Sequence, residues 1–176
     1  MRDRYKILDN EHLYFITSTI VDWIPVFTSK KYFHLIFDTI KFYQEHDELK
    51  IYAYVIMPNH IHLILSCNDV SKTMASIKKY SAKKIIEELK ADKRTDILNK
   101  FYELKKDYKI TSKYQVWQEG YHPQLISSAE MFEQKINYIH YNPVKKGLVN
   151  EIEEWKYSSA VDYFSDIKGL IDIEKL

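Results

Sequence analysis

Residues 51–67, IYAYVIMPNHIHLILSC, decide the fold that the sequence predicts. The first half alternates in the period-2 pattern of a β-strand whose two faces are both at least partly covered. One face of this strand is expected to carry Ile51, Ala53, Val55 and Met57. Pro58 and Asn59 indicate a tight turn, because proline fixes φ and asparagine tolerates unusual backbone angles. A second alternating run begins directly after the turn, so the stretch predicts a β-hairpin.

Two histidines stand at the start of the second predicted strand. His60 and His62 are two residues apart and share a face, while Ile61, Leu63 and Leu65 occupy the other face. Neutral imidazole is a common ligand for divalent metals, and two histidines at this spacing can reach one ion. The alternative is a pair of ordinary strand histidines, and only a partner elsewhere in the chain can decide between the two.

A partner for the histidines occurs in residues 136–149, INYIHYNPVKKGLV. Tyr138 and Asn142 are four residues apart, so they share one face of a predicted helix. Pro143 disfavours a helical conformation at Asn142 and is expected to stop the helix about there. The amide oxygen of Asn142 can serve as a third metal ligand, and the phenol of Tyr138 as a nucleophile toward a metal-activated target. The alternative is a packed aromatic helix with an asparagine cap.

Several spaced motifs follow one another in an order known from one family. They are HLYFITSTIVDWIPVF at 12–27, the paired histidines after a PNH turn, WQEGYHPQLI at 117–126, YIHYNPVKKGLV at 138–149 and WKYSSAVDYF at 155–164. In this order they resemble the REP-associated tyrosine transposases, which belong to the single-tyrosine HUH transposases. The resemblance extends over residues 11–165, which is most of the chain.

The resemblance implies a site and a reaction. It implies that His60, His62 and Asn142 hold a Mg²⁺ or Mn²⁺ ion and that Tyr138 is the nucleophile, and all four positions match the family pattern. The implied activity is cleavage and rejoining of single-stranded DNA at hairpin or palindromic repeats, through a 5′-phosphotyrosine intermediate. The implied partner is a single-stranded DNA hairpin, and the protein is expected to act as a monomer or a homodimer.

Composition is typical of one globular domain. With 176 residues, 45% of them hydrophobic and 29% charged, the chain is expected to form a single domain over residues 1–176. No apolar run is long enough to span a membrane, and the first residues lack the apolar core of a secretory signal. The single cysteine, Cys67, excludes an intrachain disulfide and fits a reducing, cytoplasmic compartment.

The order of predicted elements indicates an α+β fold. Strands are expected at residues 13–21 and 123–126 besides the hairpin, and Pro123 indicates that the last strand lies at an edge. The order favours a ferredoxin-like split βαβ sandwich, an antiparallel sheet with helices mainly on one face. Helices are expected at 29–46, 70–90 and 129–141, with a shorter helix or mobile connection at 92–107 and a short aromatic helix at 155–164.

Local positive charge suggests contacts with DNA, although the formal net charge is only +1. Residues 72–84 carry a cluster of lysines with no acidic residue among them, a pattern typical of phosphate-binding surfaces. The alternative for this cluster is a solvated helix face. Two lysines follow Asn142 and would flank the scissile strand, and a histidine in the WQEGYH motif can bind DNA, assist proton transfer or cap a strand. The predicted DNA-binding residues are Lys78, Lys79, Lys83, Lys145, Lys146 and His122.

Two other functions stay open on the sequence alone. A DNA-binding regulator that has kept the fold would bind hairpin DNA and form no covalent adduct. A metal-dependent hydrolase would use water as its nucleophile, and it would keep its activity in Tyr138→Phe while losing it in His60→Ala.

Overall fold

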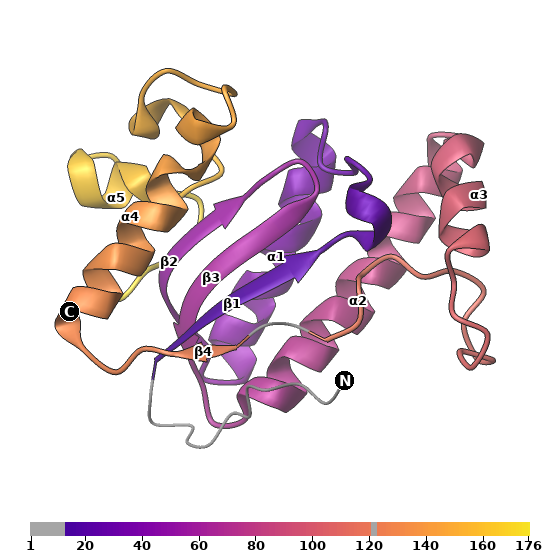
Figure 1. Ribbon diagram of the computed structural model, residues 1–176, viewed down its shortest axis with the longest axis horizontal. Helices are drawn as coiled ribbons and strands as arrows, with labels where there is room; N and C mark the ends of the chain where they lie inside the picture. The colour runs from indigo at the N-terminus through magenta and orange to yellow at the C-terminus, as the bar shows by residue number, and fades with distance from the viewer. Residues whose placement is uncertain (1–12, 121–122) are drawn as a thin grey trace.

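Four antiparallel strands form a sheet at the centre of the computed structural model, which describes residues 13–120 and 123–176 (Figure 1). The strands are β1 (Tyr14–Thr19), β2 (Lys50–Ile56), β3 (His60–Ser66) and β4 (Gln124–Leu125). Their order in the sheet is β2-β3-β1-β4. This is the split βαβ order that the sequence predicts. It places β3, which carries the histidines, in the interior of the sheet, and β4 beside β1 at an edge.

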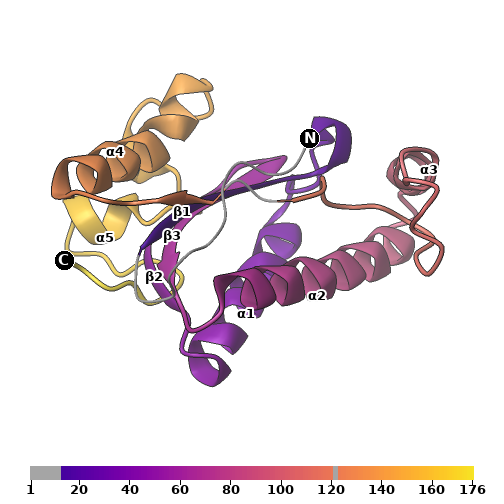
Figure 2. The same ribbon diagram turned by 60° about the horizontal axis from the view of Figure 1, so that its bottom comes forward.

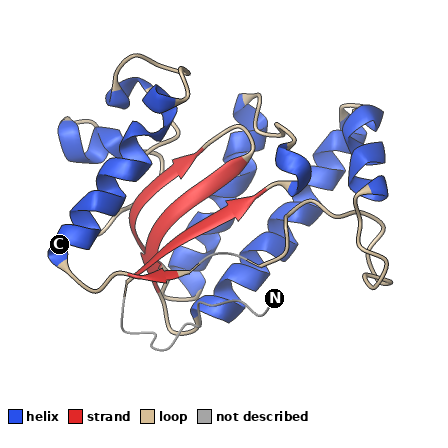
Figure 3. Ribbon diagram, in the orientation of Figure 1, coloured by secondary structure: helices blue, strands red, loops and turns tan. Residues whose placement is uncertain are grey.

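Helices cover both faces of the sheet (Figures 2 and 3). The helices are α1 (Lys30–His46), α2 (Val70–Ala91), α3 (Thr95–Glu103), α4 (Ala129–Lys145) and α5 (Ala160–Phe164), with short 3-10 turns at η1 (Val21–Trp23) and η2 (Ile152–Glu154). The α1–α2 pair lies on one face, and α4 lies on the other. Among the described residues, no helix is both long and apolar enough to cross a membrane. The predicted α+β class is confirmed, but the helices lie on both faces of the sheet and not mainly on one. Residues 92–107 form the helix α3 followed by a loop.

Strand alternation divides the apolar side chains into two cores. Ile16, Ile56 and Leu63 face α1 and α2 in the larger core. Phe15 and Ile64 face α4 in the smaller one. Each fully buried aliphatic or aromatic side chain contributes roughly 1.5–3 kcal/mol to stability, so packing of this kind fixes α4 over the histidine face.

A β-bulge in β2 changes which side chains share a face. Ile51 pairs with Leu65, but the next residue in register is Ala53, so Tyr52 is an extra residue on this strand. Ile51 therefore belongs to the core under α1 and α2, while Ala53 and Val55 belong to the core under α4. The expectation that Ile51 shares a face with these two residues was wrong, because a bulge shifts the alternation by one position.

Helix α4 continues past Pro143, and the predicted stop near Asn142 was wrong. The proline lies in the last turn of a helix that ends at Lys145. There its missing N–H costs one hydrogen bond, and the N–H groups of Gly147 and Leu148 donate back to carbonyls of the final turn at 2.9 and 3.0 Å. This is the Schellman motif, and Gly147 supplies the left-handed φ of 68° that it requires.

Residues 155–164 form less helix than the sequence predicts, because only α5 is helical. Before α5 the chain runs along the edge of β2, where the N–H of Ile56 donates to the carbonyl of Tyr157 at 2.9 Å. Farther along, the N–H of Glu174 donates to the carbonyl of Ile51 at 2.8 Å. The edge of β2 offers unpaired backbone groups, so these residues bond to the strand instead of extending the helix.

Candidate active site

Strand β3 holds the two predicted histidines side by side on the face that α4 covers. The ring centroids of His60 and His62 lie 4.8 Å apart, and both side chains are buried. Antiparallel pairing with β1 places Thr19 opposite His60 and Thr17 opposite His62. Phe15, also on β1, stacks on the His62 ring with 5.4 Å between centroids. Strand pairing therefore fixes both imidazoles in one site.

Helix α4 brings Tyr138 to the same site. Ile136 and Ile139 pack against the sheet and hold the helix in place. The ring centroid of Tyr138 lies 5.1 Å from that of His62 and 5.8 Å from that of Phe15. The side chain is 41% exposed. A phenol beside the histidines and open to solvent can meet a bound substrate.

Asn142 lies one turn beyond Tyr138 on α4, and its side chain is buried. Tyr138 lies beside His62, and the charge of Lys146, the residue after α4, acts on His60. Asn142 therefore lies on the chain between the residue that packs on His62 and the residue whose charge lowers the pKa of His60. Its Oδ1 and the Nε2 of His62 are both buried without a hydrogen-bond partner among the described residues. Buried polar atoms are normally paired, and both atom types are metal ligands, so these residues fit a metal site.

Hydrogen bonds orient both imidazoles and place their protons. The Nδ2 of Asn59 donates to the carbonyl of Trp23 at 3.0 Å, which leaves Asn59 Oδ1 facing the Nδ1 of His60 at 2.7 Å. An amide oxygen can only accept, so Nδ1 of His60 carries the proton. The hydroxyl of Thr17 lies 2.7 Å from Nδ1 of His62 and can accept in the same way. Each imidazole then presents the lone pair of Nε2, as metal-binding histidines do.

Burial keeps both imidazoles neutral. Burial, with a smaller contribution from the charge of Lys146, lowers the pKa of His60 to about 4. It also lowers the pKa of His62 to about 3, with smaller contributions from His60 and Lys135. A histidine must be deprotonated to bind a metal ion. Both side chains therefore meet that requirement at neutral pH.

Lysine side chains flank the exposed phenol. The Nζ of Lys145 lies 5.9 Å from the ring centroid of Tyr138, and the Nζ of Lys135 lies 6.0 Å from it and 4.5 Å from the Phe15 ring. Partial burial lowers the pKa of Lys135. Lys145 therefore lies beside the phenol, and the positive charge of Lys146 contributes to the lowered pKa of His60. The arrangement places two positive charges beside the exposed phenol.

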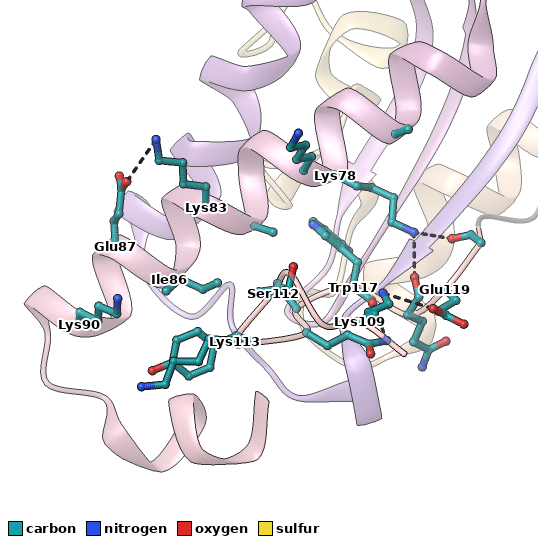
Figure 4. A pocket seen from close by; sticks show the side chains of 18 residues that line it. Lys78, Lys83, Ile86, Glu87, Lys90, Lys109, Ser112, Lys113, Trp117 and Glu119 are labelled. Carbon is teal, nitrogen blue, oxygen red and sulfur yellow. Dashed lines mark hydrogen bonds and ion pairs between the residues drawn. The ribbon is translucent and has the colours of Figure 1, made fainter. Parts of the chain in front are cut away.

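The predicted lysines of α2 lie apart from the histidines, because α2 covers the other face of the sheet (Figure 2). Lys79 and Lys83 line a groove of about 780 Å³ between α2 and residues 109–120 (Figure 4). Lys78 is turned inward, where its ammonium donates to the carbonyls of two loop residues, and burial lowers its pKa to about 8. Lys78 therefore anchors the loop. The predicted DNA contact His122 lies outside the described residues.

Sequence reasoning missed several residues that shape the site. They are Phe15, Thr17, Trp23, Asn59 and Lys135. Lys135 had a usable signal, because it precedes Tyr138 by three residues and so shares its helix face. Asn59 had one too, as the residue directly before His60. The others depend on the register of β1 with β3 and on the loop after β1, which no local pattern reports.

Replacing Thr17 with valine is expected to weaken Mn²⁺ binding roughly 10- to 100-fold, because His62 loses the oxygen that orients its ring. Titration calorimetry of the DNA-free protein with Mn²⁺ measures the effect. Thr17→Ser keeps the hydroxyl and should restore the affinity. Ser18→Ala removes a buried, unpartnered hydroxyl from the same strand and should leave Mn²⁺ affinity unchanged. Equal affinity in Thr17→Val and the unmodified protein would contradict the role assigned to Thr17.

An antiparallel ferredoxin-like sheet with a tyrosine-bearing helix over two strand histidines defines the class of protein. Residues 12–142 match the family model described as transposase IS200-like. The match covers more than half of the chain, so the chain belongs to the IS200-like transposase family.

Comparisons with individual proteins narrow the resemblance. The chain is 28% identical over 127 residues to the curated "Putative REP-associated tyrosine transposase" of Haemophilus influenzae, across 72% of this chain and 66% of that protein. The fold is similar to the solved structure of a REP-associated tyrosine transposase bound to a REP hairpin. That match has a TM-score of 0.69 and 18% identity, and it covers 100% of this chain and 95% of the other. The resemblance drawn from the motifs is confirmed.

Proposed function

We propose that this protein is a metal-dependent single-stranded DNA transesterase. It cleaves and rejoins DNA at hairpin or palindromic repeats through a 5′-phosphotyrosine intermediate. One observation carries the proposal: the exposed Tyr138 ring lies 5.1 Å from His62, and the Nε2 of His62 and the Oδ1 of Asn142, one helical turn beyond Tyr138, are buried without a partner in the described part of the chain. Membership in the transposase family supports the reaction class. The REP hairpin bound by the structural relative supports a hairpin as the substrate.

His60, His62 and Asn142 would hold Mg²⁺ or Mn²⁺. The pair of Nε2 atoms and the amide oxygen provide two imidazole ligands and one harder oxygen ligand, which suit these ions when water and phosphate oxygens complete the shell. When bound, such an ion would supply Lewis-acid activation of the scissile phosphate. The neutral imidazoles keep their lone pairs available for it.

Tyr138 would act as the nucleophile. Its phenolic oxygen attacks the phosphorus of the scissile phosphodiester, forming the Oη–P bond as the P–O3′ bond breaks. The phenol loses a proton and the departing 3′-oxygen gains one, so the step consumes no water. The reverse attack by a 3′-hydroxyl, from the same strand or another, rejoins DNA and releases the phenol. The ammonium groups of Lys135 and Lys145 lie where they can bind the phosphate oxygens during both steps.

The lysines of α2 would act at a distance from the chemistry. Lys79 and Lys83 line the groove on the far side of the sheet, where they can bind backbone phosphates of the hairpin. Contacts of this kind position DNA and carry no base information. The role of Lys78 in this scheme is to hold the groove loop through the two carbonyls that it binds.

The test is a covalent adduct between the protein and DNA. The protein is incubated with Mn²⁺ and a labelled hairpin with single-stranded flanks, built on a repeated palindrome from its source genome. We expect a band that survives denaturation, needs the divalent ion and maps to Tyr138 by mass spectrometry of the digested adduct. A matched blunt duplex should give no band. Hairpin binding without any adduct would favour a regulatory protein and contradict the proposal.

A further inference from the structure

We infer that Trp23 is a stacking platform for the DNA base on the leaving-group side of the cleaved bond. This inference rests on the proposed function, because it assigns the substrate a place relative to Tyr138 and the histidines. The base concerned belongs to the nucleotide that keeps the free 3′-hydroxyl after cleavage.

Trp23 is exposed to solvent. Its side chain is 55% exposed, although it lies directly beside the candidate active site. The backbone around it is also unusual, because Asp22 and Trp23 both have positive φ, at 53° and 54°. L residues other than asparagine and aspartate rarely adopt this conformation, and such outliers gather at functional sites. The loop therefore holds an apolar ring in solvent at a conformational cost.

Hydrogen bonds fix the loop that carries Trp23 to the site. The N–H of Val21 donates to the carbonyl of Val116 at 2.8 Å, just before the two residues with positive φ. The side chain of Asn59 then bridges Trp23 and His60, with Nδ2 donating to the Trp23 carbonyl and Oδ1 accepting from the imidazole. One amide thus sets the position of the tryptophan relative to the histidine. A platform held in this way needs little ordering when a base arrives.

Four aromatic rings contact one another in series across the site. The Trp23 centroid lies 5.5 Å from His60, His60 lies 4.8 Å from His62, and His62 lies 5.1 Å from Tyr138. In this series of ring contacts the two histidines separate the tryptophan from the nucleophile. In phosphoryl transfer the attacking and leaving oxygens are roughly in line on opposite sides of the phosphorus. A phosphate held at the histidines and attacked from Tyr138 directs its leaving 3′-oxygen, and the nucleotide attached to it, toward Trp23.

Stacking on Trp23 would keep the cleaved strand in place. Proteins commonly hold single-stranded nucleic acid by stacking its bases on aromatic side chains. Each stacked base raises the affinity about 5- to 150-fold. Rejoining requires the 3′-hydroxyl to stay near the phosphotyrosine. A base held at Trp23 provides this without any sequence-specific contact.

The experiment measures binding without cleavage, in the Tyr138→Phe background. Hairpins with single-stranded flanks are prepared with each flanking nucleotide in turn made abasic, and affinity is measured with Mn²⁺ present. We expect Trp23→Ala to weaken binding of the intact hairpin about 5- to 150-fold, and Trp23→Phe to weaken it less. In the protein that retains Trp23, an abasic site at one flanking position should weaken hairpin binding by a similar factor. In Trp23→Ala, the same abasic site should cause no additional loss of affinity.

Controls separate stacking from a structural role. Phe42→Ala removes a ring that is 53% exposed on α1, under the other face of the sheet, and should leave the affinity unchanged. Trp23→Ala should bind Mn²⁺ normally in the absence of DNA. Three results would overturn the inference. The first is that Trp23→Ala weakens binding by the same factor whichever flanking nucleotide is abasic, and the second is that it leaves the affinity for every hairpin unchanged. The third is a Trp23→Ala variant whose only defect is weaker Mn²⁺ binding.

The two proposals can fail separately. With Tyr138 present and DNA saturating, Trp23→Ala should still form the covalent adduct, because the nucleophile and the metal ligands are intact. An adduct without the abasic-position effect would overturn the stacking role and leave the transesterase proposal standing. Absence of the adduct in the unmodified protein would contradict the proposed function, while the abasic series would still report whether Trp23 binds a base.

Discussion

Replacing Tyr138 with phenylalanine is expected to abolish the covalent protein–DNA adduct, with a loss on the order of 10⁴-fold or more in the rate of strand cleavage. The substitution removes only the attacking oxygen and keeps the ring that packs on His62 and Phe15. Because the side chain is partly exposed, stability should change by less than about 0.5 kcal/mol. A denaturing gel of labelled hairpin DNA measures the adduct and the rate of cleavage, and thermal unfolding measures the change in stability. A measurement of hairpin affinity shows whether the variant still binds DNA.

The matched control is Tyr141→Phe, three residues later on α4. Tyr141 is 46% exposed, similar to Tyr138. The Tyr141→Phe variant should form the adduct at the normal rate. If Tyr138→Phe still cleaves DNA and leaves no adduct, water is the nucleophile and the protein is a hydrolase. If the adduct persists in Tyr138→Phe, another residue carries the DNA.

Replacing His62 with glutamine is expected to lower Mn²⁺ affinity by about 100-fold or more and to reduce adduct formation by about 10²- to 10⁴-fold, since Lewis-acid activation contributes several kcal/mol. Glutamine is chosen over alanine because His62 is packed between Phe15, His60 and Tyr138. A cavity at this position would destabilise the sheet. Calorimetric titration with Mn²⁺ and adduct assays over a range of Mn²⁺ concentrations separate weaker binding from lost activation.

His140 provides a stringent control for this substitution. It is another buried histidine, on the same helix as Tyr138, and its Nε2 lies 2.9 Å from the hydroxyl of Ser159 on the side away from the site. His140→Gln should lose stability and still bind Mn²⁺ normally. Equal loss of Mn²⁺ affinity in both variants would mean that the effect of His62→Gln comes from unfolding. It would contradict the assignment of His62 as a metal ligand.

The sequence predicted the elements that bear the site because their patterns are local. The alternation around His60 and His62 reports a strand face directly. The spacing of Tyr138 and Asn142 reports a helix face. What joined the two segments was the resemblance to a family, since periodicity alone does not say that α4 crosses over β3.

The rest could not be predicted because it depends on tertiary contacts. The bulge at Tyr52 changes which face of the sheet the following side chains of β2 occupy, although the sequence pattern of this strand continues without a break. Pro143 looks like a helix stop, but the final turn closes through Gly147 and Leu148. Trp23 looks like one aromatic among many until the loop after β1 places it beside His60.

The segment that runs along the outer side of β2 has a consequence for how copies of the protein can associate. Tyr157 and Glu174 of this segment bond to Ile56 and Ile51 of β2, and these bonds use backbone groups that another chain would need in order to continue the sheet. Two molecules therefore cannot form one continuous β-sheet through β2 unless this C-terminal segment, the tail, first detaches from the strand. Self-association by a different route, through helices or through shared nucleic acid, is compatible with the tail staying in place.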